Sequence, residues 1–133
     1  PPRTHIYEWL QTQNSYQRIY CAGLRPYGLF GRELSNRVFY DLHSNVLDRE
    51  GRGRLLKIMR EFHPDLLLIS VDPHDYTGPA KKPLIVDWLK TQSCFDQVFT
   101  DDTVSGFAVK DGWQEMLKDH ANEISEKPVP MHG

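Results

Sequence analysis

A nearly continuous apolar stretch, LLLISV at residues 66–71, carries the strongest structural signal in this chain. Apolar and polar side chains do not alternate along it, so we expect both faces of the corresponding strand to be buried. Strands of this kind are typical of the centre of a parallel α/β sheet, in which helices cover both faces. Ligands of such sheets bind just beyond the carboxyl ends of the strands. The polar turn at residues 72–76 is therefore a candidate binding site.

Amphipathic helices are predicted before and after this strand. In residues 49–62 the apolar positions recur at three- and four-residue spacing, as expected for one buried face. Pro64 ends this helix, because the residue before a proline avoids helical angles. Residues 82–91 show the same spacing and predict a second helix, and a short helix is expected at 6–10.

Short runs of β-branched and aromatic side chains predict the remaining strands. They lie at residues 18–24, 37–42 and 95–100, with a polar loop at 101–106 and a short fifth strand at 107–109. A last helix is expected after Asp111, its cap, with a buried face formed by Trp113, Met116, Leu117 and Ile124. The order of these elements predicts right-handed crossovers between parallel strands. We therefore expect a small three-layer, Rossmann-like α/β domain with a mostly parallel sheet of about four to five strands.

The length of 133 residues suits a single domain, which we place at 1–124, followed by an aperiodic and flexible tail at 125–133. No apolar run reaches the roughly 18 residues needed to cross a membrane. The chain starts Pro-Pro-Arg without an initiator methionine, which suggests a processed product or a piece of a larger protein. Cys21 and Cys94 lack the spacing of a metal site and are expected to be buried, reduced thiols, with a disulfide between them as the alternative. Reduced thiols favour an intracellular location, in the cytoplasm or the nucleus.

The net charge of −2 gives the whole chain no general attraction to nucleic acid or membranes. A local basic patch is nevertheless predicted along residues 49–60. Its members are Arg49, Arg52, Arg54, Lys57 and Arg60. Such a patch either binds the phosphates of a nucleic acid or forms an ordinary solvated helix face.

Acidic residues at or near the predicted strand ends are the main candidates for chemistry. They are Asp41, Asp72, Asp101 and Asp102. In a parallel sheet they would converge on one edge, where clustered carboxylates need a proton, a bound cation or a basic partner. The alternative is that each aspartate caps the helix after its strand.

The turn Asp72-Pro73-His74-Asp75-Tyr76 combines a carboxylate, a rigid proline and an aromatic ring. Asp72 and nearby carbonyl groups could accept hydrogen bonds from an amino group, and Tyr76 could stack on a planar base. The alternative is an ordinary proline turn with Tyr76 packed on the surface.

Residues 48–73, with EGR near the start and PDLLLISVDP at the end, resemble part of the S-adenosylmethionine-dependent methyltransferase-like domains of some retroelement polyproteins. They are also similar to DNA methyltransferases, in which such a strand ends in a proline-containing catalytic turn. The resemblance implies S-adenosylmethionine as cofactor and nucleic acid as substrate or ligand. It implies a catalytic turn of Asp72, Pro73 and Tyr76. It implies a cofactor pocket of Gly23, Gly28, Gly31 and Asp41.

The chain departs from the methyltransferase pattern in two respects. No Gly-x-Gly loop follows the first predicted strand, and no cysteine follows Pro73, so chemistry at cytosine C5 is not implied. A degenerate copy without catalytic activity is therefore an alternative.

A second resemblance concerns VFYDLHSNVL at residues 38–47, which is similar to the first motif of haloacid dehalogenase-like phosphatases. It implies Asp41 as the nucleophile, Ser70 as the phosphate-binding residue and a magnesium site of Asp41, Asp101 and Asp102. Lys81 or Lys82 would match the lysine of that family. The second aspartate of the motif is replaced by His43, and its threonine by Asn45.

A third hypothesis is an α/β module without catalytic activity that binds other protein chains in a larger assembly. A serine nucleophile motif, GxSxG, and a phosphate-binding P-loop are both absent from the sequence. Whether the chain is an enzyme is thus left open by its residues.

Overall fold

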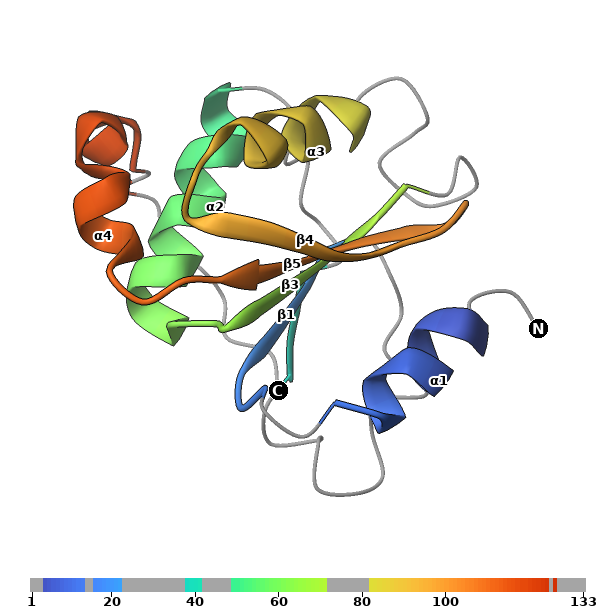
Figure 1. Cartoon of the computed structure of the whole chain (residues 1–133). Coiled ribbons are helices and arrows are strands. Elements are labelled where there is room, and N and C mark those ends of the chain that lie inside the picture. Colours follow the sequence, from blue (N-terminus) through green and yellow to red (C-terminus); the bar gives the residue numbers. More distant parts are fainter. Residues whose placement is uncertain are drawn as a thin grey trace.

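The computed structural model describes residues 4–13, 16–22, 38–41, 49–71, 82–124 and 126. Its centre is an open sheet of five strands, and helices cover both faces of this sheet (Figure 1). The strands are β1 (Ile19–Ala22), β2 (Val38–Asp41), β3 (Leu66–Ser70), β4 (Phe95–Thr100) and β5 (Val104–Val109). The helices are α1 (Thr4–Gln11), α2 (Arg49–Phe62), α3 (Lys82–Thr91), α4 (Trp113–Met116) and the short 3-10 helix η3 (Lys118–Glu123).

The strand order is β2-β1-β3-β5-β4, and the sheet is mixed. β1 pairs in parallel with β2 and with β3, whereas β5 is antiparallel to both β3 and β4. The expectation of a mostly parallel sheet is therefore not confirmed, because two of its four strand pairs are antiparallel. For β4 and β5 the reason is the short turn at 101–103, since parallel neighbours need a crossover of a dozen or more residues.

The fifth strand begins at Val104, three residues before the sequence predicts it. Ser105 and Gly106 have low strand propensity, but both are buried between neighbouring strands. A β-carbon at Gly106 would lie 3.2 Å from the side chains of Leu68 and Phe99. The absence of a side chain at Gly106 therefore lets β5 pass between them.

The predicted helices α2 and α3 and strand β4 begin and end at the residues expected from the sequence. The stop at the end of α2 is visible in the backbone, because His63 has a positive φ of 54° and its N–H donates to Met59 O at 2.9 Å. Histidine tolerates this left-handed conformation better than a β-branched residue does. Pro64 follows, and the chain turns directly into β3.

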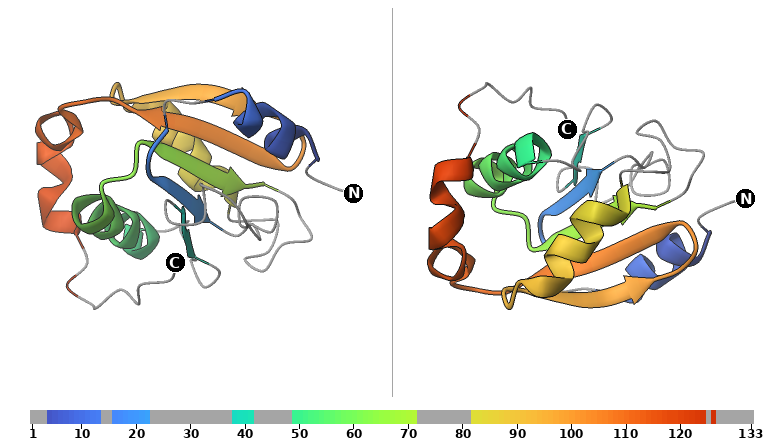
Figure 2. Two further views of the ribbon diagram at one scale, coloured as in Figure 1. Left: turned by 90° about the horizontal axis from the view of Figure 1, so that it is seen from below. Right: turned by 90° about the horizontal axis from the view of Figure 1, so that it is seen from above.

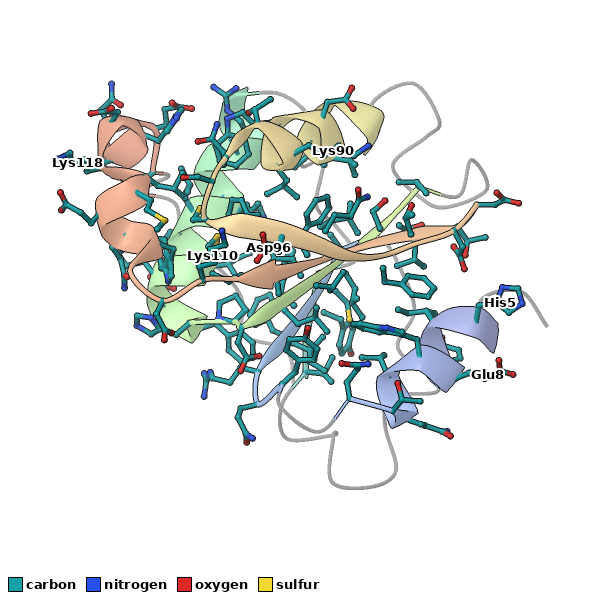
Figure 3. All side chains as sticks on the ribbon, viewed as in Figure 1. His5, Glu8, Lys90, Asp96, Lys110 and Lys118 are labelled. Carbon is teal, nitrogen blue, oxygen red and sulfur yellow. The ribbon has the colours of Figure 1, made fainter. Side chains whose placement is uncertain are left out.

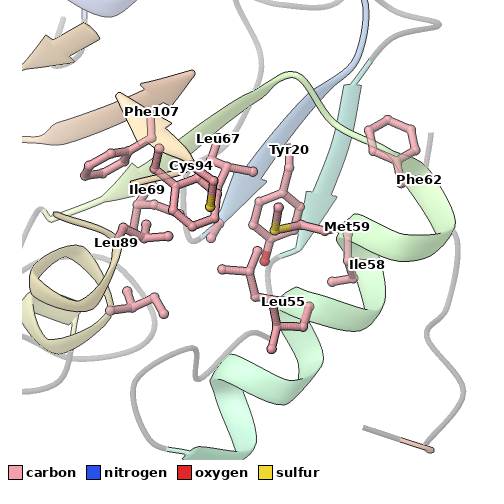
Figure 4. Packing of buried hydrophobic residues seen from close by; sticks show 14 of the residues in the cluster. Tyr20, Leu55, Ile58, Met59, Phe62, Leu67, Ile69, Leu89, Cys94 and Phe107 are labelled. Carbon is pink, nitrogen blue, oxygen red and sulfur yellow. The ribbon is translucent and has the colours of Figure 1, made fainter. Parts of the chain in front are cut away.

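Two hydrophobic clusters lie on opposite sides of the sheet. The helices α2 and α3 cover one face, where Leu55, Met59 and Leu89 pack against Tyr20 and Leu67 (Figure 4). The helix α1 covers the other face (Figure 2). That second cluster contains Ile6, Leu10, Ile19, Cys21, Val38, Leu66, Leu68 and Val104. All five residues of β3 are buried, which confirms the prediction that both of its faces are covered.

Cys21 and Cys94 are both free and buried, as the sequence predicts. They belong to different hydrophobic clusters, so the sheet separates the two thiols. Burial raises the pKa of each thiol above its ordinary value. Both side chains therefore stay protonated at neutral pH and act as small apolar groups.

The last helix differs from its prediction. Gly112, with φ 80°, precedes α4, and no side chain caps this helix, so the expected cap by Asp111 is wrong. α4 has only four residues before the chain tightens into η3, and of the expected apolar face Trp113 and Ile124 are partly buried against the core. Leu117 is buried, but Met116 is 49% exposed. Among the described residues, no helix is long and apolar enough to span a membrane.

Candidate functional site

The carboxyl ends of β2, β1 and β3 lie next to one another, with β1 in the middle. Ala22, the last residue of β1, pairs with Asp41 on one side and with Ile69 on the other. The chain leaves β1 for β2 on one side and later returns to β3 on the other side. This reversal is the topological switch point at which open α/β sheets bind their ligands.

Asp41 is one of two predicted site residues, with Ser70, that the described backbone places at this edge. It is the last residue of β2 and stands in register with Ala22 of β1. The other residues assigned to the cofactor pocket, Gly23, Gly28 and Gly31, lie outside the described residues. So do Asp72, Pro73 and Tyr76 of the predicted catalytic turn, and these roles stay predictions.

Ser70 ends β3 at the same edge and is fully buried. The next residue, Val71, donates its backbone N–H to Thr103 O at 2.8 Å. This bond ties the carboxyl end of β3 to the turn between β4 and β5. The carboxyl end of β3 is thereby held in place directly before the predicted turn at 72–76.

Asp101 has a structural role in the turn between β4 and β5. Its Oδ1 accepts hydrogen bonds from the backbone N–H groups of Thr103 and Val104, both at 2.8 Å, and from Thr103 Oγ1 at 3.0 Å. Its Oδ2 lies 4.0 Å from Nδ1 of the exposed His5. The carboxylate thus closes a short turn, and its neighbour Asp102 is exposed.

The strand order does not bring Asp41 together with Asp101 and Asp102. β2 and β4 are the two outermost strands, and three strands separate them. At about 4.8 Å per strand this places the two edges about 19 Å apart. A magnesium ion binds its oxygen ligands at about 2.0–2.1 Å, so these three aspartates cannot share one ion. Among the described residues, no three histidine, cysteine or acidic side chains are close enough to hold a metal.

The basic residues of α2 do not form the exposed row that the sequence suggests. Lys57 is only 8% exposed, and Arg52 is bound to an acidic side chain. Arg54 is half-buried and already engaged in an interaction, whereas Arg60 is exposed. The side chain of Arg49 lies outside the described residues. Elsewhere on the surface the charged groups form local pairs, such as Lys110 with Asp96 at 3.5 Å (Figure 3).

A polar cluster that the sequence does not predict joins α2, α3 and η3. Glu123 Oε1 accepts hydrogen bonds from Arg52 Nε at 3.1 Å and Nη2 at 2.7 Å, while Oε2 lies 2.6 Å from His120 Nδ1. The Trp88 ring completes the cluster. The Arg52 guanidinium lies 5.5 Å from its centroid, and the His120 ring meets it edge-on at 5.5 Å. The only sequence signal for this cluster is the three-residue spacing of His120 and Glu123.

The environment of Glu123 favours its charged form. Burial alone would raise the pKa of this carboxyl, but hydrogen bonds and the charges of His120 and Arg52 outweigh burial and lower the pKa. A group whose pKa is lowered by folding stabilises the native state above its unfolded pKa and loses that contribution as pH falls. The contribution of Glu123 should therefore be present above pH 4.5, the ordinary value, and decline below it.

We expect Glu123→Gln to be less stable than the unaltered chain at pH 7 and to approach it in stability as the pH falls below 4.5. Glutamine keeps the shape of the side chain but removes the charge that Arg52 and His120 stabilise. Urea unfolding of both chains between pH 3 and pH 7 would measure the difference in free energy. A difference that does not change with pH would contradict this account of Glu123.

The described part of the edge offers a carboxylate-bearing strand end beside a topological switch point, and the polar cluster lies on the outer helices. The side chain of Asp41 itself lies outside the described residues. A carboxylate at such a position can accept hydrogen bonds from the hydroxyl groups of a ligand. Comparison with protein-family models, with curated proteins and with solved structures finds no match for this chain.

Proposed function

We propose that this chain is a methyltransferase-like domain with a Rossmann-like core. It would bind S-adenosylmethionine at the shared edge of β2, β1 and β3 and would act on, or bind, nucleic acid. One observation carries the proposal: β1 has parallel neighbours on both sides, and Asp41 ends β2 in register with Ala22. Nucleotide-type cofactors bind at this point of open α/β sheets.

The position of Asp41 fits the ribose of such a cofactor. In dinucleotide-binding sheets, an acidic residue about 20 residues beyond the first strand–helix turn accepts hydrogen bonds from ribose hydroxyls. Asp41 has a comparable spacing from Gly23, the residue that follows β1. When bound, the cofactor would supply an electrophilic methyl group. Asp72 and its neighbouring carbonyl groups would orient an amino group by hydrogen bonds, and Tyr76 would stack on the base that carries it.

Calorimetric titration of the chain with S-adenosylmethionine and with S-adenosylhomocysteine tests the proposal. We expect both to bind, and Asp41→Asn to weaken the binding about 10- to 100-fold, because hydrogen bonds to charged groups contribute about 1.5–3 kcal/mol. Asp102→Asn is the matched control, since it makes the same change at an exposed position on the far edge of the sheet. It should leave the affinity unchanged.

Two results would count against this function. If neither compound binds at millimolar concentration, the chain is better explained as an α/β interaction module. If both bind but Asp41→Asn and Asp102→Asn behave alike, the cofactor does not use the edge assigned to it. Transfer of a labelled methyl group to an oligonucleotide would then separate an active domain from a degenerate one that only binds.

A further inference from the structure

The helix η3 makes polar contacts with the body of the protein, and apolar residues hold the chain at both of its ends: Leu117 before it is buried, and Ile124 after it packs against the core. The helix itself has no buried residue, and the preceding α4 has none either. Leu117, between them, is the buried anchor of the segment. Beyond this anchor, η3 contacts α2 along its side, as Figure 1 shows at the C-terminal end of the coloured chain. Segments with little apolar burial open at a low cost in free energy.

Two side chains of η3, Glu123 and His120, contact Arg52 of α2 and Trp88 of α3. Glu123 presents a carboxylate to the guanidinium of Arg52, with N–O distances of 2.7 and 3.1 Å. His120 presents the edge of a flat ring to the indole of Trp88, at 85° between the ring planes. Arg52 itself lies over the same indole. η3 therefore covers a guanidinium and an aromatic ring that lie next to each other.

An arginine beside a half-buried tryptophan is suited to a single-stranded nucleic acid once the segment over them has moved away. Guanidinium groups bind phosphate through paired hydrogen bonds, and an indole face stacks on any base. In the closed chain, the carboxylate of Glu123 occupies the place of a phosphate on Arg52. The ring of His120 occupies one of the positions around the Trp88 ring at which another ring can make contact. Both ligand-binding features are thereby satisfied within the chain.

We propose that η3 is a detachable strap over a nucleic-acid contact pair formed by Arg52 and Trp88, and that it keeps the affinity of the closed chain low. The inference rests on the nucleic-acid part of the proposed function and not on the cofactor site. The charge of the segment supports it, because acidic groups outnumber basic ones between α4 and residue 126. Those acidic groups are Glu115, Asp119, Glu123 and Glu126. A nucleic acid is a polyanion and would compete with these acidic groups for the same basic side chains.

Fluorescence polarisation with a labelled oligo-deoxythymidine of about 20 nucleotides, at low salt, tests the strap. The double variant with His120→Ala and Glu123→Gln should bind at least about tenfold more tightly than the unaltered chain, because phosphate and base contacts are then open. Adding Arg52→Ala or Trp88→Ala to this variant should remove the gain. Glu115→Gln is the matched control, since Glu115 is exposed and pairs only with Lys118 among the described residues.

Hydrogen exchange of the unaltered chain makes the test independent of how well the variants fold. The oligonucleotide should accelerate exchange at the amide of His120, which donates to Leu117 O at 2.9 Å in the closed form. Unchanged exchange with bound oligonucleotide would overturn the strap. So would a gain in affinity that Glu115→Gln reproduces or that survives Arg52→Ala.

The two proposals fail in different ways in these measurements. S-Adenosylmethionine is left out of the titration, so its binding is judged separately. If every chain binds the oligonucleotide equally, only the strap is overturned. If no chain binds it at all, the strap and the nucleic-acid part of the proposed function fall together, while the cofactor result stands.

Discussion

Alanine at Leu67 and alanine at Leu68 are each expected to lower the free energy of unfolding by about 2–5 kcal/mol. The two side chains point to opposite faces of β3, and both are fully buried. Leu67 lies in the cluster beneath α2 and α3, and Leu68 lies in the cluster beneath α1. A large loss at both positions requires that both faces be covered, since removing an exposed leucine side chain would cost little.

Urea unfolding, followed by circular dichroism, would measure both losses. Val98→Ala is the control, because Val98 is 36% exposed on the outer strand β4 and should change stability by less than about 0.5 kcal/mol. A cost near zero for Leu68→Ala would mean that α1 does not cover its face in solution. In that case, the three-layer arrangement would have to be given up.

The elements that the sequence predicts correctly have strong local patterns. Helix α2 carries apolar residues at helical spacing and stops at Pro64, so local rules alone determine its limits. Strand β3 is apolar throughout, and this continuity indicates burial on two faces without any knowledge of its neighbours. In both cases, the information lies within a window of a few residues.

The features that the sequence does not predict depend on distant partners. Strand β5 contains Ser105 and Gly106, which are poor strand formers, and it is stabilised by pairing with β3 and β4. Gly106 is suited to its place because a β-carbon there would lie only 3.2 Å from the side chains of Leu68 and Phe99. The ion pair of Arg52 with Glu123 joins residues far apart in the chain, and no local pattern marks it.

In the candidate site, too, the sequence predicts the local features but not those that depend on distant partners. The position of Asp41 at a strand end follows from the strand pattern, and the structure places it there. The expected convergence of Asp41 with Asp101 depends on strand order, which local patterns do not determine. Because β5 inserts between β3 and β4, the end of β4 lies at the far edge of the sheet. The sequence therefore predicts individual strand ends well but does not predict which of them are neighbours.

Replacing Asp65 with alanine is expected to cost about 2–3 kcal/mol of folding free energy and to lower the melting temperature by about 10 °C. The carboxylate of Asp65 accepts hydrogen bonds from the backbone N–H groups of Gln17 at 2.8 Å and Arg18 at 3.1 Å. Its own backbone N–H donates to Arg18 O at 2.9 Å, and its carbonyl accepts from Val109 N at 3.0 Å. One residue thus joins the beginning of β1 to β3 and to the end of β5.

Two variants separate this role from a general effect of charge. Asp65→Asn keeps one acceptor oxygen and should fall between the unaltered chain and Asp65→Ala. Asp96→Ala removes an equal charge from an exposed pair with Lys110, and exposed pairs contribute little, so its melting temperature should hardly change. If Asp96→Ala costs as much as Asp65→Ala, the bonds to Gln17 and Arg18 are not what stabilises the strand start. If Asp65→Ala alone is costly, this side chain holds the start of β1, the strand that carries Asp41 of β2 in register at the shared edge.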